Sequence, residues 1–380
     1  TGGGCPHILA EPQRTNLIQY SEDFSQGVWT KSAITIDSNE TISPDGTLNA
    51  DKMVCNANSS NNLYFSNTYP FTSTGNYTNS IYLKKDTSSG WMALRIWSGS
   101  GTIGVSVWFD LDNGILGTSS SGGGFTLINA TSETLTNDWY RLTISGTTNA
   151  TSYFRLDFVD GDGLNTFTTV SGKSCFIWAG QTEVGSYATS YIPTSGGTVT
   201  RNQDLFTRDG IGSLINSTEG VLFLEVATLS LTSILQMITL SDGSYSNVVM
   251  FRYYDTSSND MQVQVRVAGV TTASILFTLT DAKDFNKIAF KYKENDFALW
   301  VNGVEVGTDT SGITFTSSTL NKLSFDRGDG GNPLFGKVKQ LQVYDTSLTD
   351  NQLIQLTGEA GTHFFESYAE MAEALTYTIQ

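Results

Sequence analysis

The sequence predicts an all-β protein made of two tandem β-sandwich domains with a short C-terminal helix. Many short runs alternate apolar and polar side chains at a period of two, which is typical of half-buried strands. The chain contains 37 glycines, and 15% of its residues are charged while 12% are aromatic. Such a composition favours strands joined by turns and loops. With 380 residues, the chain is long enough for two domains that each bury a core.

The clearest strand pattern covers residues 285–306. Two alternating runs are separated by an acidic turn, and Asn302-Gly303 then predicts a type I′ turn because both residues readily adopt positive φ. We therefore expect a three-strand meander. The side chains expected in its core are Ile288, Phe290, Phe297, Leu299 and Val301. Trp300 falls on the opposite face of the sheet, the side expected to meet solvent.

Three runs in the first domain, residues 91–97, 105–111 and 153–158, each place an apolar row on one face. Their other rows hold aromatic side chains beside charged ones, and the candidates for glycan binding are Trp91, Arg95, Trp97, Trp108, Arg155 and Asp157. Aromatic rings stack on the apolar face of a sugar, and Arg or Asp forms charge-assisted bonds to hydroxyls or carboxylates. The alternative is that loops, a helix or another subunit covers the tryptophans.

The most regular alternation in the chain lies at residues 261–267, where Gln264 and Arg266 occupy the outward row. If this strand lies in the same sheet as Trp300, the three side chains form a second polar and aromatic surface. Gln264, Arg266 and Trp300 are therefore further candidates for glycan binding.

A loop at residues 326–332 is rich in oxygen ligands. Asp326, Asp329 and Asn332 carry the side-chain oxygens that calcium prefers, so they form a candidate site for a structural calcium ion. The twelve-residue EF-hand pattern is absent, and a solvated turn is the alternative interpretation. No other cofactor is predicted.

The net charge of −16 argues against nucleic acid and anionic membranes as partners, because few cations are available to neutralise phosphate. No apolar run is long enough for a membrane span, so membrane insertion is not expected. Cys5, Cys55 and Cys175 are widely spaced and indicate neither a disulfide framework nor a zinc site.

Catalytic motifs are missing from the sequence, so no catalytic residue is predicted and a non-enzymatic role is favoured. The two histidines, His7 and His363, lie in terminal segments, and no nucleophile elbow, zinc-protease motif or phosphate-binding loop is present. A glycosidase carboxylate pair stays open, because geometry defines such pairs and the chain has 37 acidic residues.

Two family resemblances add to this interpretation. Residues 285–306, followed by a strand at residues 335–344 and a short helix at residues 348–353, resemble the laminin-G/concanavalin-A-like lectin jelly roll. The first domain resembles a carbohydrate-binding-type jelly roll found in phage virion proteins. The segments that carry this second resemblance, in the order that family shows, are residues 16–31, 43–52, 81–85, 108–111, 139–142 and 183–194.

These resemblances imply a fibre or spike component, of the tail or head, at the surface of a phage virion. Its partners would be a cell-surface polysaccharide or other glycan, other virion proteins, and further copies of itself in a homotrimer. Two alternatives are a purely structural capsid or tail decoration protein and a polysaccharide depolymerase. Neither the glycan nor the host follows from the resemblance.

The predicted domain limits follow changes in composition. Residues 1–16 form an extended entry segment, 17–194 the carbohydrate-binding-like jelly roll, and 195–206 a Ser/Thr/Gly-rich linker after Pro193. Residues 207–358 form the concanavalin-A/laminin-G-like sandwich, and 359–380 an amphipathic helix and tail. The first residue is Thr1 rather than Met, so we expect a fragment or a processed product.

Overall fold

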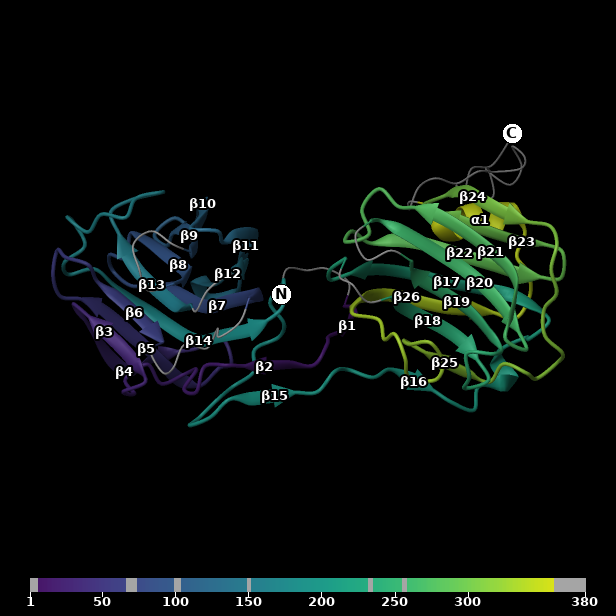
Figure 1. Ribbon diagram of the computed structural model, residues 1–380, viewed down its shortest axis with the longest axis horizontal. Helices are drawn as coiled ribbons and strands as arrows, with labels where there is room; N and C mark the ends of the chain where they lie inside the picture. The colour runs from purple at the N-terminus through teal and green to yellow at the C-terminus, as the bar shows by residue number, and fades with distance from the viewer. Residues whose placement is uncertain are drawn as a thin grey trace, which may run out of the picture. The chain divides into compact units, whose positions relative to one another are not determined.

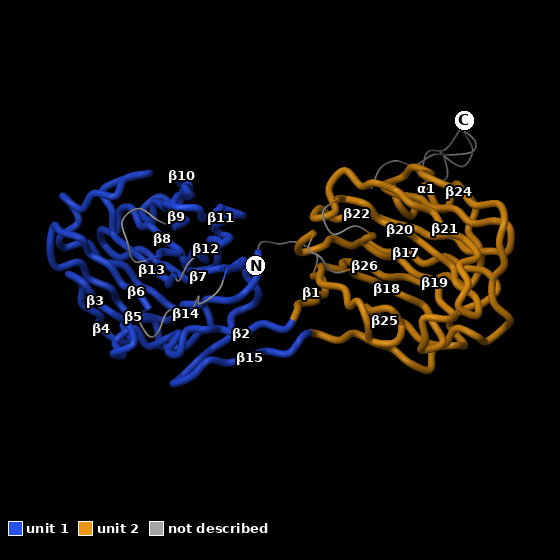
Figure 2. The backbone as a smooth tube through the Cα atoms, in the orientation of Figure 1, with its two compact units in different colours: residues 1–3, 13–203 blue, residues 4–12, 204–380 orange. Residues whose placement is uncertain are grey.

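A computed structural model describes residues 6–65, 74–98, 104–148, 152–231, 235–254 and 258–358. Nearly all of their regular structure is β-strand, and the strands form tandem β-sandwiches, which confirms the predicted fold class. The chain divides into two compact units (Figure 2). Of the described residues, those between 13 and 203 belong to unit 1, and 6–12 together with those from 204 to 358 belong to unit 2.

Unit 1 contains two six-stranded antiparallel sheets within its described residues (Figure 1). Sheet 1A has the order β10-β9-β8-β13-β6-β3, with strands β3 (Trp29–Ser32), β6 (Asn62–Phe65), β8 (Trp91–Trp97), β9 (Gly104–Asp110), β10 (Ile115–Gly122) and β13 (Tyr153–Val159). Sheet 1B has the order β11-β12-β7-β14-β5-β4, with strands β4 (Ile34–Ile42), β5 (Leu48–Cys55), β7 (Gly75–Lys85), β11 (Thr126–Thr134), β12 (Trp139–Thr148) and β14 (Ser174–Val184). A 3-10 turn, η1 (Thr136–Asp138), precedes β12.

The core of unit 1 contains the apolar rows that the alternation predicts. Met92, Leu94 and Ile96 on β8 are fully buried in one hydrophobic cluster. The cluster also includes the predicted inward residues Val105, Val107, Phe109, Leu111, Phe154, Leu156 and Phe158. Because strand side chains alternate between faces, the remaining residues of β8, β9 and β13 lie on the outer face of sheet 1A.

Unit 2 contains two six-stranded sheets in the part of the chain that the structure describes. Sheet 2A has the order β1-β26-β17-β22-β23-β24, with strands β1 (Ile8–Ala10), β17 (Glu219–Thr228), β22 (Asn286–Lys293), β23 (Phe297–Val301), β24 (Val304–Asp309) and β26 (Gly336–Tyr344). Sheet 2B has the order β16-β25-β18-β19-β20-β21, with strands β16 (Thr207–Arg208), β18 (Gln236–Ser241), β19 (Val248–Tyr253), β20 (Asp260–Val267), β21 (Val270–Thr278) and β25 (Lys322–Ser324). A 3-10 turn, η2 (Gly212–Leu214), precedes β17.

The predicted meander is confirmed as β22-β23-β24. Asn302 and Gly303 have φ values of 49° and 86°, and Val301 pairs with Val304 across this two-residue turn, as a type I′ hairpin requires. All five residues predicted to face inward are in the core of unit 2. The predicted short helix is α1 (Asp350–Thr357), which begins with a capping box between Thr349 and Gln352.

Three short strands lie in segments that were predicted to be an extended entry segment and a linker. The predicted linker contains β15 (Val199–Arg201), which pairs with β2 (Arg14–Asn16) of the entry segment. The same entry segment contains β1, which pairs with β26 of sheet 2A. The amphipathic helix predicted after residue 358 lies outside the described residues, as do Cys5 and His363. No helix within the described ranges is long and apolar enough to cross a membrane.

Candidate functional site

The outer face of sheet 1A brings together five of the six candidates from the first domain. Arg95 on β8 donates from Nε to Oδ2 of Asp157 on β13 at 2.7 Å, and Arg155 donates from Nε to Oδ1 of the same carboxylate at 2.8 Å. The guanidinium carbons of Arg95 and Arg155 lie 5.4 and 4.9 Å from the ring centroid of Trp97. Arg95 also lies 5.2 Å from the ring of Trp108. One carboxylate therefore holds two arginines against aromatic rings.

Burial divides these residues into a support and a surface. Arg95 is 2% exposed and Asp157 is fully buried, whereas Trp97 is half-buried and the side chain of Arg155 is 15% exposed. Arg95 also donates to Ser106 Oγ and Asn165 Oδ1, so the side chains of Asp157, Ser106 and Asn165 together hold its guanidinium in place. Arg95 and Asp157, which were candidates for glycan binding, are therefore too buried to contact a sugar directly, and their pairing offsets the cost of burying both charges.

Trp108 and Trp91 lie on the predicted outer face of sheet 1A, but Trp108 is covered there. Trp108 is 2% exposed, and its indole Nε1 donates to the carbonyl of Leu164 at 2.8 Å, in the loop that follows β13. Trp91 is half-buried against the small cluster that contains Trp108 and Val159. Trp108 therefore packs under a loop, as the alternative interpretation held, and does not form part of an exposed platform.

Two tyrosines on this face were missed. Tyr153 is the strand partner of Trp97, and Tyr64 on β6 is the partner of Arg155. Their rings are 5.2 Å apart, and both side chains are half-buried. Tyr153 was in the outward row of its strand, so the sequence contained a signal for it. Tyr64 lies on a four-residue strand whose pairing with β13 no local pattern reveals.

The second predicted surface does not exist as proposed, because Trp300 and the Gln264–Arg266 strand lie in different sheets. Trp300 is on β23 of sheet 2A, is 6% exposed, and packs with Leu353 of helix α1. The prediction that it faces solvent is wrong. Gln264 and Arg266 are on β20 of sheet 2B, where Arg266 lies over the ring of Tyr245 at 4.4 Å.

The carboxylates of the candidate calcium loop have hydrogen-bond and ion-pair partners within the loop. Asp326 is 3% exposed, and its Oδ1 accepts the N–H groups of Gly328 and Gly330. Asp329 forms an ion pair with Arg327 at 2.9 Å, so an arginine already supplies the positive charge. Among the described residues, no group of three or more His, Cys, Asp or Glu side chains is placed to hold a metal ion. These contacts favour the alternative interpretation, a hydrogen-bonded turn, and a structural calcium ion stays a prediction.

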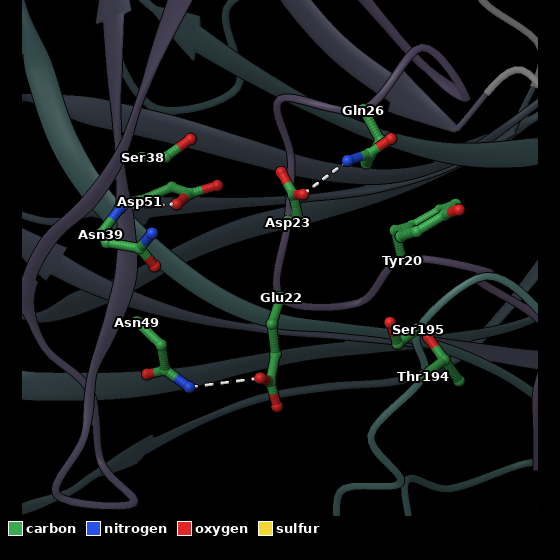
Figure 3. Close-up of a pocket in the computed structure, with 10 residues that line it drawn as sticks. All are labelled: Tyr20, Glu22, Asp23, Gln26, Ser38, Asn39, Asn49, Asp51, Thr194 and Ser195. Atoms are coloured by element: carbon green, nitrogen blue, oxygen red, sulfur yellow. Dashed lines mark hydrogen bonds between the residues drawn. The ribbon is translucent and has the colours of Figure 1, made fainter.

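A cavity of about 430 Å³ in unit 1 is lined by polar residues (Figure 3). Burial raises the pKa of Asp51 in its wall to about 6. Both oxygens of this carboxylate accept backbone N–H groups, from Phe24 and Asn39. The ammonium of Lys31 nearby binds three backbone carbonyls, those of Phe24, Ser25 and Gln26. Through these hydrogen bonds, Asp51 and Lys31 hold the loop at residues 24–26 in place.

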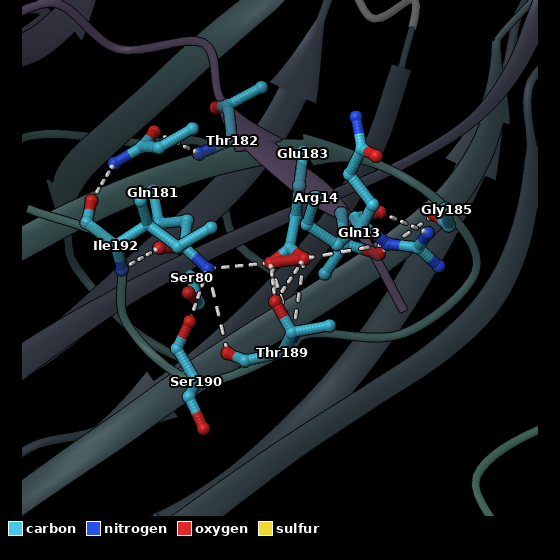
Figure 4. A network of polar contacts seen from close by, with 12 residues as sticks. Gln13, Arg14, Ser80, Gln181, Thr182, Glu183, Gly185, Thr189, Ser190 and Ile192 are labelled. Carbon is cyan, nitrogen blue, oxygen red and sulfur yellow. Dashed lines mark hydrogen bonds and ion pairs between the residues drawn. The ribbon is translucent and has the colours of Figure 1, made fainter. Parts of the chain in front are cut away.

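The segment at residues 183–194, part of the jelly-roll resemblance, has a structural role (Figure 4). The carboxylate of Glu183 is fully buried and accepts both the N–H and the hydroxyl of Thr189, and Gln181 Oε1 accepts the N–H of Ile192. Arg14 Nε lies 3.8 Å from Glu183 Oε1. Burial raises the pKa of Glu183. These polar side chains tie the end of β14 to the chain that follows, so this segment of the resemblance marks the scaffold of unit 1.

Comparisons with known proteins support a lectin-type fold. A family model described as the concanavalin A-like lectin/glucanases superfamily matches residues 228–354, within unit 2. No curated protein matches the chain significantly.

Solved structures with similar folds are distant in sequence. Ruminococcus gnavus IT-sialidase CBM40 is 20% identical over 38% of this chain and 84% of its own, with a TM-score of 0.32. Mouse laminin α1 domains LG4-5 are 9% identical over 90% of this chain and 92% of their own, with a TM-score of 0.28. The native SAP-like pentraxin of Limulus polyphemus is 13% identical over 40% of this chain and 80% of its own, with a TM-score of 0.30. The family match carries the conclusion: unit 2 contains a laminin G/concanavalin A-like β-sandwich, as the sequence predicted.

Proposed function

We propose that this protein binds glycans without catalysing a reaction, and that the outer face of sheet 1A is one binding site. The observation that carries the proposal is the group of Trp97, Arg155, Tyr64 and Tyr153 on that face. Half-buried rings offer flat apolar surface to a pyranose, while the guanidinium of Arg155 donates to hydroxyls at its edge. The lectin-type fold of unit 2 supports the same class of ligand.

The buried pair beneath this face makes it suitable for binding. Arg95 and Asp157 are fixed by several hydrogen bonds, and Arg95 contacts the ring of Trp97 while Asp157 binds Arg155. A site whose side chains are already ordered loses less conformational entropy when a ligand binds. The carboxylate also offsets part of the arginine charge. This balance suits a sugar without a negative charge.

At the level of the whole particle, we propose that the chain is part of a virion fibre or spike at the virion surface. There it would adsorb to a host polysaccharide, with other virion proteins and two further copies of itself as partners. The support is the ordered set of segments in unit 1 that resembles a phage virion family. Light scattering of the full-length protein tests the homotrimer, and a monomer at micromolar concentration would contradict it.

A glycan array with the full chain, followed by titration calorimetry on the best neutral ligand, tests the binding site. Replacing Trp97 with Ala removes the ring and should cost about 1–3 kcal/mol of affinity. Leu214→Ala, in unit 2, is the control, because its side chain is 66% exposed and distant in sequence from the site. Unchanged affinity in folded Trp97→Ala protein would reject this site.

The same assay separates the two alternative functions. Reducing sugar released from a bound polysaccharide would identify a depolymerase. Failure of the folded protein to bind any glycan on the array would favour a purely structural decoration protein.

A further inference from the structure

The outer face of sheet 2B concentrates arginine and tyrosine side chains. The inner face of this sheet holds core residues such as Val263 and Val265. The alternate residues of β19 and β20 therefore point outward. They include Arg252, Gln262, Gln264 and Arg266, and the turn between β18 and β19 contributes Tyr245.

The aromatic rings and guanidinium groups on this face are stacked. Tyr245 has the guanidinium carbon of Arg266 at 4.4 Å from its ring centroid and that of Arg327 at 5.2 Å. Arg252 lies 4.9 Å from the ring of Tyr254, which is 43% exposed. Each of these contacts is within the usual range for a cation–π interaction. Three arginines and two tyrosines thus share one surface.

Two of these arginines have no acidic partner among the residues that the structure describes. Arg252 donates through Nε and Nη2 to Gln262 Oε1. Arg266 donates to the carbonyls of Tyr245 and Gly269 and to Thr271 Oγ1. Within the described ranges, no carboxylate lies at ion-pair distance from either guanidinium, whereas Arg327 is paired with Asp329. In the described part of the chain, the hydrogen-bond partners of these two positive charges are all neutral groups.

The position of these charges favours an anion. Burial lowers the pKa of Arg252, and repulsion from Arg266 contributes to the lowering, so the two guanidinium groups interact unfavourably. Gln262 and Gln264, both less than 10% exposed, donate to Ser274 Oγ at 2.9 and 3.4 Å and form a polar floor beside them. A chain with a net charge of −16 has many carboxylates, yet none of the described ones neutralises this pair.

We propose that the outer face of sheet 2B is a second glycan site and that its ligand is a sugar bearing a carboxylate. The carboxylate is received by Arg252 and Arg266, whose N–H groups suit planar oxyanions. The sugar ring lies against Tyr245 or Tyr254, because a phenol ring offers apolar contact area. This inference rests on the proposed function only in taking a glycan as the ligand, since it uses residues of the other unit.

The test measures binding of the full chain to a tetrasaccharide of uronic acid and to α2,3-sialyllactose, two sources of a sugar carboxylate. Their neutral counterparts are the carboxyl-reduced tetrasaccharide and lactose. We expect at least one acidic sugar to bind about tenfold or more tightly than its neutral counterpart, because charge-assisted bonds are lost with the carboxylate. Equal affinity for acidic and neutral forms, or no binding of either acidic sugar, would overturn the proposal.

Variants locate the site. Arg252→Gln and Arg266→Gln should each weaken acidic-sugar binding by about tenfold, which corresponds to loss of one charge-assisted contact. Arg208→Gln removes the same charge from an exposed position on β16 and should change the affinity by less than about twofold. Wild-type affinity in both folded site variants would overturn the proposal.

Two further outcomes keep the inference distinct from the proposed function. Trp97→Ala should leave acidic-sugar binding intact, whereas Arg266→Gln should leave neutral-glycan binding at sheet 1A intact. If Arg266→Gln fails to fold, Arg252→Gln and the comparison of acidic with neutral sugars on the wild-type chain still decide the matter. If a sulfated oligosaccharide binds and neither carboxylated sugar does, the ligand is a sulfated sugar and the inference is refuted.

Discussion

The outer faces of sheets 1A and 2B both place arginines beside aromatic rings, but they differ in how the positive charge is balanced. On sheet 1A, Asp157 pairs with Arg95 and Arg155 and is fully buried between them. On sheet 2B, Arg252 and Arg266 bond to neutral oxygens among the described residues. The comparison indicates that similar side chains can serve different ligands. An arginine whose charge is balanced by a carboxylate suits a neutral ligand, whereas one without such a partner can bind an anion.

The largest expected effect comes from removing the carboxylate of Asp157, which balances the charges of Arg95 and Arg155 on sheet 1A. Asp157→Asn leaves Arg95, which is 2% exposed, without its ion-pair partner. Loss of one member of a buried pair costs about 3–5 kcal/mol. Urea unfolding followed by tryptophan fluorescence measures the free energy of unfolding. Asp329→Asn is the matched control, because its pair with Arg327 is partly exposed and should contribute at most about 1 kcal/mol. Equal, small losses of unfolding free energy in both variants would contradict the distinction between the buried pair at Asp157 and the partly exposed pair at Asp329.

Two tryptophans, one in each unit, provide a second comparison between a buried side chain and a partly exposed one. Trp300 packs under α1. Replacing it with Ala should lower the free energy of unfolding by about 3–5 kcal/mol, the usual effect of deleting a buried large aromatic side chain. Trp97→Ala should cost less, because its side chain is half-buried, and should act mainly on glycan affinity. Thermal unfolding of both variants checks this. A larger loss of stability in Trp97→Ala than in Trp300→Ala would reverse the assignment of the two rings.

Within unit 1, Asp51 tests what burial does to a carboxylate without an arginine partner. Its pKa in the folded protein is about 6, above the ordinary value of 3.8, because burial disfavours the charged form. The folded state therefore binds more protons than the unfolded state between these values, so this group makes stability fall as pH rises from about 4 to 6. The full effect is roughly 2–3 kcal/mol, from the size of the pKa change.

The measurement compares urea unfolding of the wild type and Asp51→Asn from pH 4 to pH 7.5. The difference in unfolding free energy between them should change across this window and become constant above about pH 7. The variant also weakens one of two backbone hydrogen bonds, which shifts the curve without giving it a pH dependence. A constant difference over the whole range would contradict the raised pKa.

The smallest expected effect concerns salt. Raising the salt concentration from 50 to 500 mM should weaken acidic-sugar binding at sheet 2B by about twofold to fivefold, because exposed charges are screened. Neutral-glycan binding at sheet 1A should change by less than about twofold. Titration calorimetry at both concentrations measures the two affinities. An equal response of both sites would show that their charge balance does not distinguish their ligands.

The core could be predicted from the sequence because strand alternation is a local property. Met92, Leu94 and Ile96 lie on the core face that the period-two alternation predicts. The Asn302-Gly303 turn also lies where its sequence predicts it. Which sheet a strand joins is not local. The strand with Gln264 is regular in sequence, yet nothing in it indicates that Trp300 belongs to the opposite sheet.

The candidate site was only partly predictable for a related reason. Alternation gives the face on which a side chain lies, but it does not say what later covers that face. The loop that contains Leu164 covers Trp108, and α1 covers Trp300. Tyr245 was missed because it lies in a turn, where no period assigns a direction, although its neighbours Arg266 and Arg327 lie in segments that the sequence marked.

The pairing of β1 with β26 has a consequence for synthesis. Ile8 and its partner Val338 are 330 residues apart, so β1 is synthesised long before the strand with which it pairs. The whole of unit 1 can fold in this interval, while β1 waits for its place at the edge of sheet 2A. Before β1 arrives, β26 presents an open row of backbone donors and acceptors, which another chain could use for strand addition. The reciprocal hydrogen bonds between the backbones of Glu11 and Asp204 and the Asp204 carboxylate fasten this returning segment to unit 2. β1 thus acts as a late closing strand that covers the backbone edge of β26 in sheet 2A.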